Sequence, residues 1–236
     1  FVTEDYVDTL RQTEDKVTYQ RLYLGKWEYD SDPNSLVDYD AVMDCFTNTG
    51  TLIGGKAISA DLAMKGRDHF VAGYWEGLRV SIEIDKDKSS GREIETDLRK
   101  LMVTRGVGRS QTVADSDGLG SYLESYLNGI KEFKNGASAF NNKYANLKAE
   151  CAYKLAEMIN KRQLQIICRP DQAEHIAEEL QLLIAANVDK DTRKKDIISK
   201  EAMKGITKRS PDYLDMLIMG MYRLVAPRTG NSTYNW

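Results

Sequence analysis

Histidine is scarce in this chain, and cysteine is almost as rare. The 236 residues include two histidines, His69 and His175, and three cysteines, Cys45, Cys151 and Cys168. Two histidines exclude a histidine-rich zinc site, and the three cysteines lack the spacing of a metal-binding motif. An odd number of widely separated cysteines is typical of reduced thiols in a cytosol. Any metal in this protein must therefore be held mostly by carboxylates, which favours Mg²⁺ or Mn²⁺.

Long hydrophobic runs are also missing. No apolar stretch approaches the about 18–20 residues that span a membrane. Residues 1–21 are acidic and polar, unlike a secretory signal peptide, so we expect no membrane partner. With 42% hydrophobic and 29% charged residues, the chain can form one large globular domain. It begins with Phe1 rather than methionine, so we expect a fragment or a processed product of a longer protein.

The net charge of −3 argues mildly against a nucleic-acid-binding protein, but the distribution of charge matters more. Between residues 189 and 209, eight basic residues stand against four acidic ones. A solvated surface is the more common explanation of such a run, and contact with phosphates is the alternative. The basic members are Lys190, Arg193, Lys194, Lys195, Lys200, Lys204, Lys208 and Arg209.

Alternation of apolar segments and glycine turns predicts a mixed sheet. Residues 57–63, 70–75 and 78–84 form the pattern of an antiparallel meander. A helix over 92–105 precedes a short strand over 111–114, and a crossover helix implies that this strand is parallel. A further strand is predicted over 164–168. The fold class is therefore α/β, with an antiparallel meander plus parallel strands flanked by helices.

Further helices are predicted over 3–10, 16–24, 39–46, 121–127, 141–161 and 170–180. In the last helix, Ser210 is expected as the N-cap and Pro211 as the first helical residue. Residues 182–188 and 195–199 are predicted to pair as a hairpin, with a helix continuing to Ala186 as the alternative. We expect an entry arm over 1–50, a main domain over 51–227 and a loose tail over 228–236.

Acidic residues stand at three places where elements begin or end. Asp61 stands near the end of the first predicted strand, and Asp115 ends the predicted parallel strand, with Asp117 two residues later. Asp212 and Asp215 share one face of the last helix. Taken singly, each has a structural explanation, since aspartate forms turns and complements helix dipoles.

The combination of these acids points to metal chemistry. Carboxyl ends of strands in an open sheet meet at one crevice, where clustered carboxylates repel each other unless cations neutralise them. Two divalent ions about 4 Å apart would do so and would activate a water for attack on a phosphodiester. The pattern therefore favours a metal-dependent nuclease.

The same stretches resemble the C-terminal nuclease domain of the large terminase subunit of tailed bacteriophages. The similarity runs in the same order through nearly the whole chain, and the SPDxxD segment is its most specific part. The stretches are YQRLYLGKW (19–27), ISADLA (58–63) with GRD (66–68), VADSDGLG (113–120), SKE (199–201) and RSPDYLDML (209–217).

This resemblance implies an RNase H-like fold and a Mg²⁺- or Mn²⁺-dependent endonuclease, with two ions, that cuts concatemeric double-stranded viral DNA during genome packaging. It also implies an N-terminal packaging ATPase beyond this chain, a portal and a small terminase subunit as partners, and the cytoplasm of the bacterial host as location. The rivals are another RNase H-like enzyme of resolvase or recombinase type, and a non-catalytic DNA-gripping module of a packaging motor.

Carried over by position, the resemblance makes Asp61, Asp115, Asp212 and Asp215 the catalytic and metal-binding residues. Asp61 would bind both ions, Asp117 competes with Asp115, and Asp212 and Asp215 are not ranked. Leu214 and Met216 depart from the small residues common in the family near the last aspartate. Lys200 is placed near the scissile phosphate. The residues expected along the DNA backbone are Lys194, Lys195, Lys200, Lys204 and Arg209.

Overall fold

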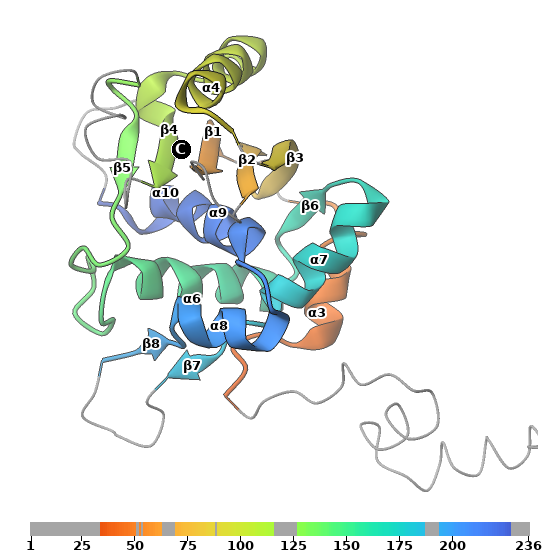
Figure 1. Ribbon diagram of the computed structural model, residues 1–236. Coiled ribbons are helices and arrows are strands. Elements are labelled where there is room, and N and C mark those ends of the chain that lie inside the picture. The colour runs from red at the N-terminus through yellow and green to blue at the C-terminus, as the bar shows by residue number, and fades with distance from the viewer. Residues whose placement is uncertain are drawn as a thin grey trace, which may run out of the picture.

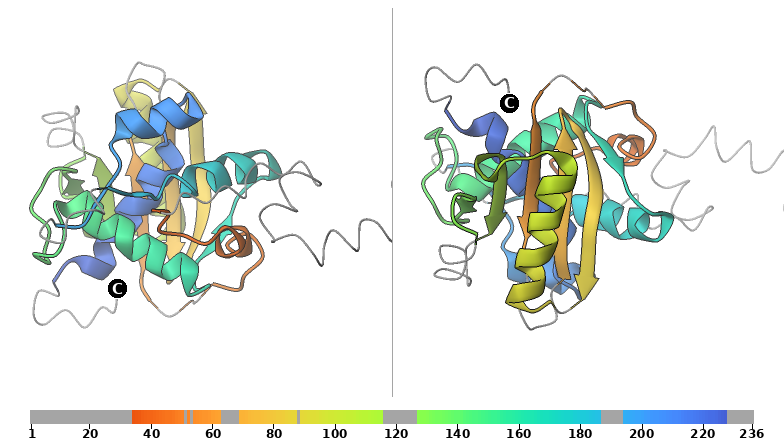
Figure 2. Two further views of the ribbon diagram at one scale, coloured as in Figure 1. Left: turned by 90° about the horizontal axis from the view of Figure 1, so that it is seen from below. Right: turned by 90° about the horizontal axis from the view of Figure 1, so that it is seen from above.

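A six-stranded sheet forms the centre of the protein, and helices cover both of its faces (Figures 1 and 2). The computed structural model describes residues 34–50, 52, 54–62, 69–87, 89–115, 127–186 and 194–227. The helices predicted over 3–10 and 16–24, nearly all of that over 121–127, and the tail over 228–236 lie outside these residues. Within them, no helix is long and apolar enough to cross a membrane.

The sheet combines antiparallel and parallel strands in the order β5-β4-β1-β2-β3-β6. β1, β2 and β3 form the predicted antiparallel meander, and β4 pairs parallel with β1. β5 extends the sheet parallel to β4, and β6 pairs parallel with β3. The predicted mixed α/β sheet is therefore confirmed. The strands are β1 (Lys56–Asp61), β2 (His69–Glu76), β3 (Arg79–Asp87), β4 (Thr112–Asp115), β5 (Lys131–Phe133) and β6 (Gln165–Ile167).

Strand alternation assigns each acid to a face of the sheet. Ile58 and Ala60 belong to the core beneath α4, whereas Ala57 belongs to the larger core on the opposite face. Because side chains alternate along a strand, Asp61 shares the face of Ala57. Val113 also belongs to the larger core, so Asp115 points to that same face.

The helices are arranged in layers around this sheet. α4 covers one face, and on the other face α9 lies between the sheet and α6 (Figure 1). Ser90 and Glu93 form a capping box that starts α4. The helices are α3 (Tyr39–Asp44), α4 (Gly91–Arg105), the short 3₁₀ helix η3 (Arg109–Gln111), α6 (Leu147–Asn160), α7 (Pro170–Leu180), α8 (Lys200–Thr207), α9 (Asp212–Gly220) and α10 (Tyr222–Val225).

Several predicted boundaries are corrected. α6 begins at Leu147 rather than at residue 141, because the Asn146 side chain accepts the N–H of Ala149 and caps the helix there. α8 was not predicted at all. α9 begins at Asp212 with Pro211 as its N-cap, so Ser210 does not cap it. The predicted hairpin is confirmed as β7 (Ala185–Ala186) and β8 (Asp196–Ile197).

The predicted arm over residues 1–50 is only partly separate from the core. Ala41, Val42 and Cys45 on or directly after α3 are fully buried in the larger core. Burial of three apolar side chains ties this segment to α6 and α7, so the expectation that it lies outside the core is wrong for residues 37–46. A linker role for the residues before it stays a prediction.

Candidate metal centre

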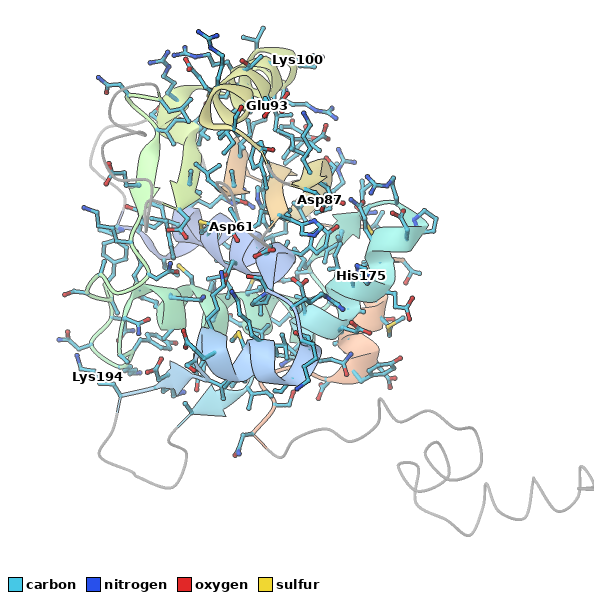
Figure 3. All side chains as sticks on the ribbon, in the orientation of Figure 1. Asp61, Asp87, Glu93, Lys100, His175 and Lys194 are labelled. Atoms are coloured by element: carbon cyan, nitrogen blue, oxygen red, sulfur yellow. The ribbon has the colours of Figure 1, made fainter. Side chains whose placement is uncertain are left out.

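Two of the predicted acids end neighbouring parallel strands. Ala60 pairs with Ala114 across β1 and β4, so Asp61 and Asp115 follow side by side at the carboxyl ends of these strands. Asp61 is 6% exposed, and Figure 3 shows its label between the sheet and α9. A rigid sheet thus presents two carboxylates toward the helix that covers it.

The other two acids lie in the first turn of α9, and both are buried. Asp212 Oδ2 accepts the backbone N–H of His69, the first residue of β2, at 2.9 Å. Asp215 Oδ1 accepts from Lys148 Nζ at 2.6 Å, and Asp215 Oδ2 accepts from Lys200 Nζ at 2.7 Å. Lys200 Nζ is also 4.0 Å from Asp212 Oδ1.

The pKa values show that the four carboxylates act on one another. Burial raises the pKa of Asp61 well above its usual range, and the charges of Asp215, Asp212 and Asp115 raise it further. Burial would also raise the pKa of Asp215, but Lys148 and Lys200 outweigh it and hold that pKa below its usual value. A bound cation would favour the charged form of Asp61 and so lower this raised pKa.

The donor set fits a hard divalent ion. All four predicted ligands are carboxylates, which suit Mg²⁺ and Mn²⁺. No described residue donates a hydrogen bond to the buried Asp61 carboxylate or forms an ion pair with it. However, the described ranges contain no group of three or more His, Cys, Asp or Glu side chains already arranged to hold a metal ion.

The predicted DNA-binding residues occupy different environments. Lys194 and Lys195 are exposed directly before the β8 strand, and Figure 3 shows Lys194 far from Asp61. Lys200 and Lys204 lie on α8, with Lys200 in the acid cluster. Arg209 forms an ion pair with Glu178, and its Nε is 3.7 Å from Glu179 Oε1. Asp117 lies outside the described residues.

Sequence reasoning missed three residues that shape the site. Lys148 belongs to α6 and reaches Asp215 across 67 positions. Glu179 on α7 accepts the N–H of Leu214 in the first turn of α9 at 3.0 Å. Asp85 at the end of β3 accepts from Tyr213 Oη at 2.8 Å and from Gln172 Nε2 at 2.7 Å. No sequence signal marks the first two, because both lie in amphipathic helices where charge is ordinary.

Comparison with known proteins identifies the fold. No protein-family model matches the sequence, and no curated protein matches it. Among solved structures, the nuclease domain of the large terminase subunit of bacterial virus Sf6 matches with a TM-score of 0.66 and 16% identity. The match covers 82% of this chain and 100% of that one.

Two further structures were solved with metal ions. A substituted form of the Sf6 domain with manganese and beta-thujaplicinol has a TM-score of 0.67 and 16% identity, covering 82% of this chain and all of that one. The large terminase nuclease from thermophilic phage G20c with bound magnesium has a TM-score of 0.54 and 12% identity, covering 80% and 97%. The predicted resemblance is thus confirmed at the level of the fold, a six-stranded mixed sheet flanked by helices like that of these nuclease domains.

Proposed function

We propose that this chain is a metal-dependent endonuclease that cleaves concatemeric double-stranded viral DNA during genome packaging. One observation carries the proposal. Asp61 and Asp115 end the neighbouring strands β1 and β4, and the charges of Asp215, Asp212 and Asp115 act on the buried Asp61, in a fold similar to that of terminase nuclease domains. The raised pKa of Asp61 supports a place for bound cations.

The proposal gives the aspartates, the residues beside them and the surface lysines different roles. The four aspartates would hold one or two Mg²⁺ or Mn²⁺ ions, with Asp61 shared between them. Bound ions of this kind activate a water and stabilise the leaving 3′ oxygen in phosphodiester hydrolysis. The His69 N–H holds the Asp212 side chain in place, and Lys200 offsets carboxylate charge beside it. Lys194, Lys195 and Lys204 would contact DNA phosphates without reading sequence.

The test is cleavage of supercoiled plasmid with Mn²⁺, Mg²⁺ or EDTA. The wild-type chain should nick and linearise plasmid only with a divalent ion. Asp61→Asn should lower the rate by several orders of magnitude, because the amide cannot balance the charge of the ions. Asp40→Asn on α3, an exposed position, is the matched control and should cut like wild type. Full-rate cutting by folded Asp61→Asn would refute the proposal.

A non-catalytic DNA-gripping module is the competing function, and the lysines around Asp215 favour it. If Lys148 and Lys200 balance the acids permanently, no metal is needed. Thermal unfolding separates the two functions. Metal binding raises the melting temperature by mass action, so Mn²⁺ should stabilise a nuclease and leave a gripping module unchanged.

The remaining parts of the proposal concern domains and partners that would act together with this chain. Residues 51–227, together with the buried segment over 37–46, would form the nuclease domain, with the residues before 37 linking it to an ATPase domain and residues 228–236 as a tail. Portal and small terminase subunit would be the assembly partners, and the bacterial cytoplasm the place of action. Co-purification of the longer protein with a portal checks this part separately from cleavage.

A further inference from the structure

Asp215 is held between two lysines, one on each carboxylate oxygen. Lys148 Nζ is 2.6 Å from Oδ1, and Lys200 Nζ is 2.7 Å from Oδ2. The side chains are 15% exposed for Lys148, 32% for Lys200 and 9% for Asp215. Bonds between charged groups this short and this shielded from water are strong, so Asp215 does not rotate freely toward an incoming ion.

The two lysines differ in what else they contact. Lys200 also lies 4.0 Å from Asp212 Oδ1, and its charge lowers the pKa of Asp61. It therefore balances the cluster as a whole. Lys148 makes its ion pair with Asp215 alone among the site acids of the described chain. Lys148 projects from the second position of α6, whose start is fixed by the Asn146 cap.

A divalent ion needs carboxylate oxygens that are free to turn toward it. The Lys148 ammonium and a divalent ion beside Asp215 Oδ1 would repel each other, because both carry positive charge in a poorly solvated place. An ion that binds Asp215 would therefore compete with the ammonium for Oδ1.

We propose that Lys148 is a positioning residue that holds Asp215 in the metal-free site and competes with the divalent cation for it. The inference rests on the proposed nuclease function, because it assumes that Asp215 is a metal ligand. Lys148 thus sets the divalent-ion concentration at which the site fills. Without the ion, Lys148 prevents the buried acids from repelling α9 away from the sheet.

The test is Mn²⁺ binding measured by titration calorimetry, without DNA and independent of cleavage. Lys148→Met keeps the apolar stem and removes the ammonium. We expect its Kd for Mn²⁺ to be about tenfold lower than that of wild type, which corresponds to about 1.4 kcal/mol. The same variant should melt at a lower temperature in EDTA, and Mn²⁺ should restore more stability to it than to wild type.

Two variants serve as controls. Lys161→Met removes an exposed lysine from the end of the same helix, where it pairs with Glu157, and should bind Mn²⁺ like wild type. Lys148→Arg keeps the positive charge and should keep the weaker, wild-type affinity. If Lys148→Met fails to fold in EDTA, Lys148→Gln measured at lower temperature provides the same comparison.

The outcomes separate the inference from the function on which it rests. Equal or weaker Mn²⁺ binding by folded Lys148→Met, with metal-dependent cleavage by wild type, overturns the inference and leaves the nuclease intact. Loss of Mn²⁺ binding in Lys148→Met would make Lys148 a supporter of the metal site and likewise overturn it. Absence of both Mn²⁺ binding and cleavage in wild type overturns the proposed function.

Discussion

Glu179 is a single buried residue that holds the first turn of α9 in place, although it is not one of the proposed metal ligands. It is 2% exposed, and it accepts the N–H of Leu214, a donor in the first turn of α9 that no helical carbonyl can satisfy. Burial raises the pKa of Glu179 to about 8, with Asp212 adding to the shift and the Leu214 bond opposing it. α7 therefore fixes the turn that carries Asp212 and Asp215.

Glu179→Gln should remove a pH dependence of stability. The folded pKa of about 8 lies above the ordinary 4.5, so the contribution of Glu179 is complete below pH 4.5 and is lost as pH rises through 8. We expect the free energy of unfolding of wild type to fall relative to Glu179→Gln across this window. Urea denaturation in EDTA measures it, with exposed Glu174→Gln as control. A difference independent of pH would contradict the assignment.

The candidate site residues that stand where an element begins or ends were predictable from the sequence. Lys148 and Glu179, which also shape the site, were not. Asp61, Asp115, Asp212 and Asp215 stand where local patterns end a strand or begin a helix, so the sequence predicted their convergence. Their roles as ligands stay a prediction. Lys148 and Glu179 lie within helices, and their partners are 67 and 35 positions away. No local pattern reports such a separation.

At the scale of elements, α9 packs tightly against the sheet. All nine of its residues are buried, whereas the sequence predicted only a stripe of Leu214, Leu217, Ile218 and Met221. Its last residue, Gly220, touches the ring of Trp75, and Trp75 Nε1 donates to Ser59 Oγ at 2.8 Å. The helix axis can approach β2 this closely only because Gly220 has no side chain.

Gly220→Ala should destabilise the fold by about 3 kcal/mol. An added Cβ would overlap the buried Trp75 ring, which its hydrogen bond to Ser59 holds in place. Gly205→Ala on α8 is the matched control, since a Cβ there meets nothing within 4 Å. The control should be neutral or slightly stabilising, because alanine favours helix over glycine. Urea denaturation compares them, and equal stability of the two variants would refute the packing argument.

At the scale of the whole molecule, basic residues extend well beyond the acid cluster. Lys194 and Lys195 lie near the β7–β8 hairpin, and Lys100 on α4 lies at the opposite end of the protein (Figure 3). A duplex that reaches from the acid cluster across α8 would meet the hairpin and would not meet α4. The acidic net charge therefore does not decide whether the protein binds DNA.

Neutralising Lys194 and Lys195 should weaken DNA binding and flatten its salt dependence. Each lost phosphate contact makes the slope of log K against log salt less steep by about 0.9. The variant with both Lys194→Ala and Lys195→Ala should therefore have a slope that is smaller in magnitude by about two. Removal of Arg92 and Lys100, two exposed cations on α4, matches the charge change and should leave the slope intact. Fluorescence anisotropy with EDTA measures both. An unchanged slope in the hairpin variant would exclude these phosphate contacts.

The strand arrangement of the sheet could be predicted from sequence, because each of its segments carries its own local pattern. The meander, the crossover helix and the parallel strand together predicted the mixed sheet. The expectation that residues 1–50 lie outside the core failed for residues 37–46, because burial of Ala41 and Val42 depends on helices more than 100 positions later in the chain. Core membership is a property of the assembled fold, and periodicity within one segment does not report it.

The late position of α9 has a consequence for the order of events during synthesis. The sheet that carries Asp61 and Asp115 leaves the ribosome well before the helix that carries Asp212 and Asp215. An unfinished chain ending before α9 can form strands, but it lacks half of the proposed ligands and the helix that covers them. On the proposed nuclease function, a growing polypeptide therefore has no complete metal site until α9 has emerged and docked.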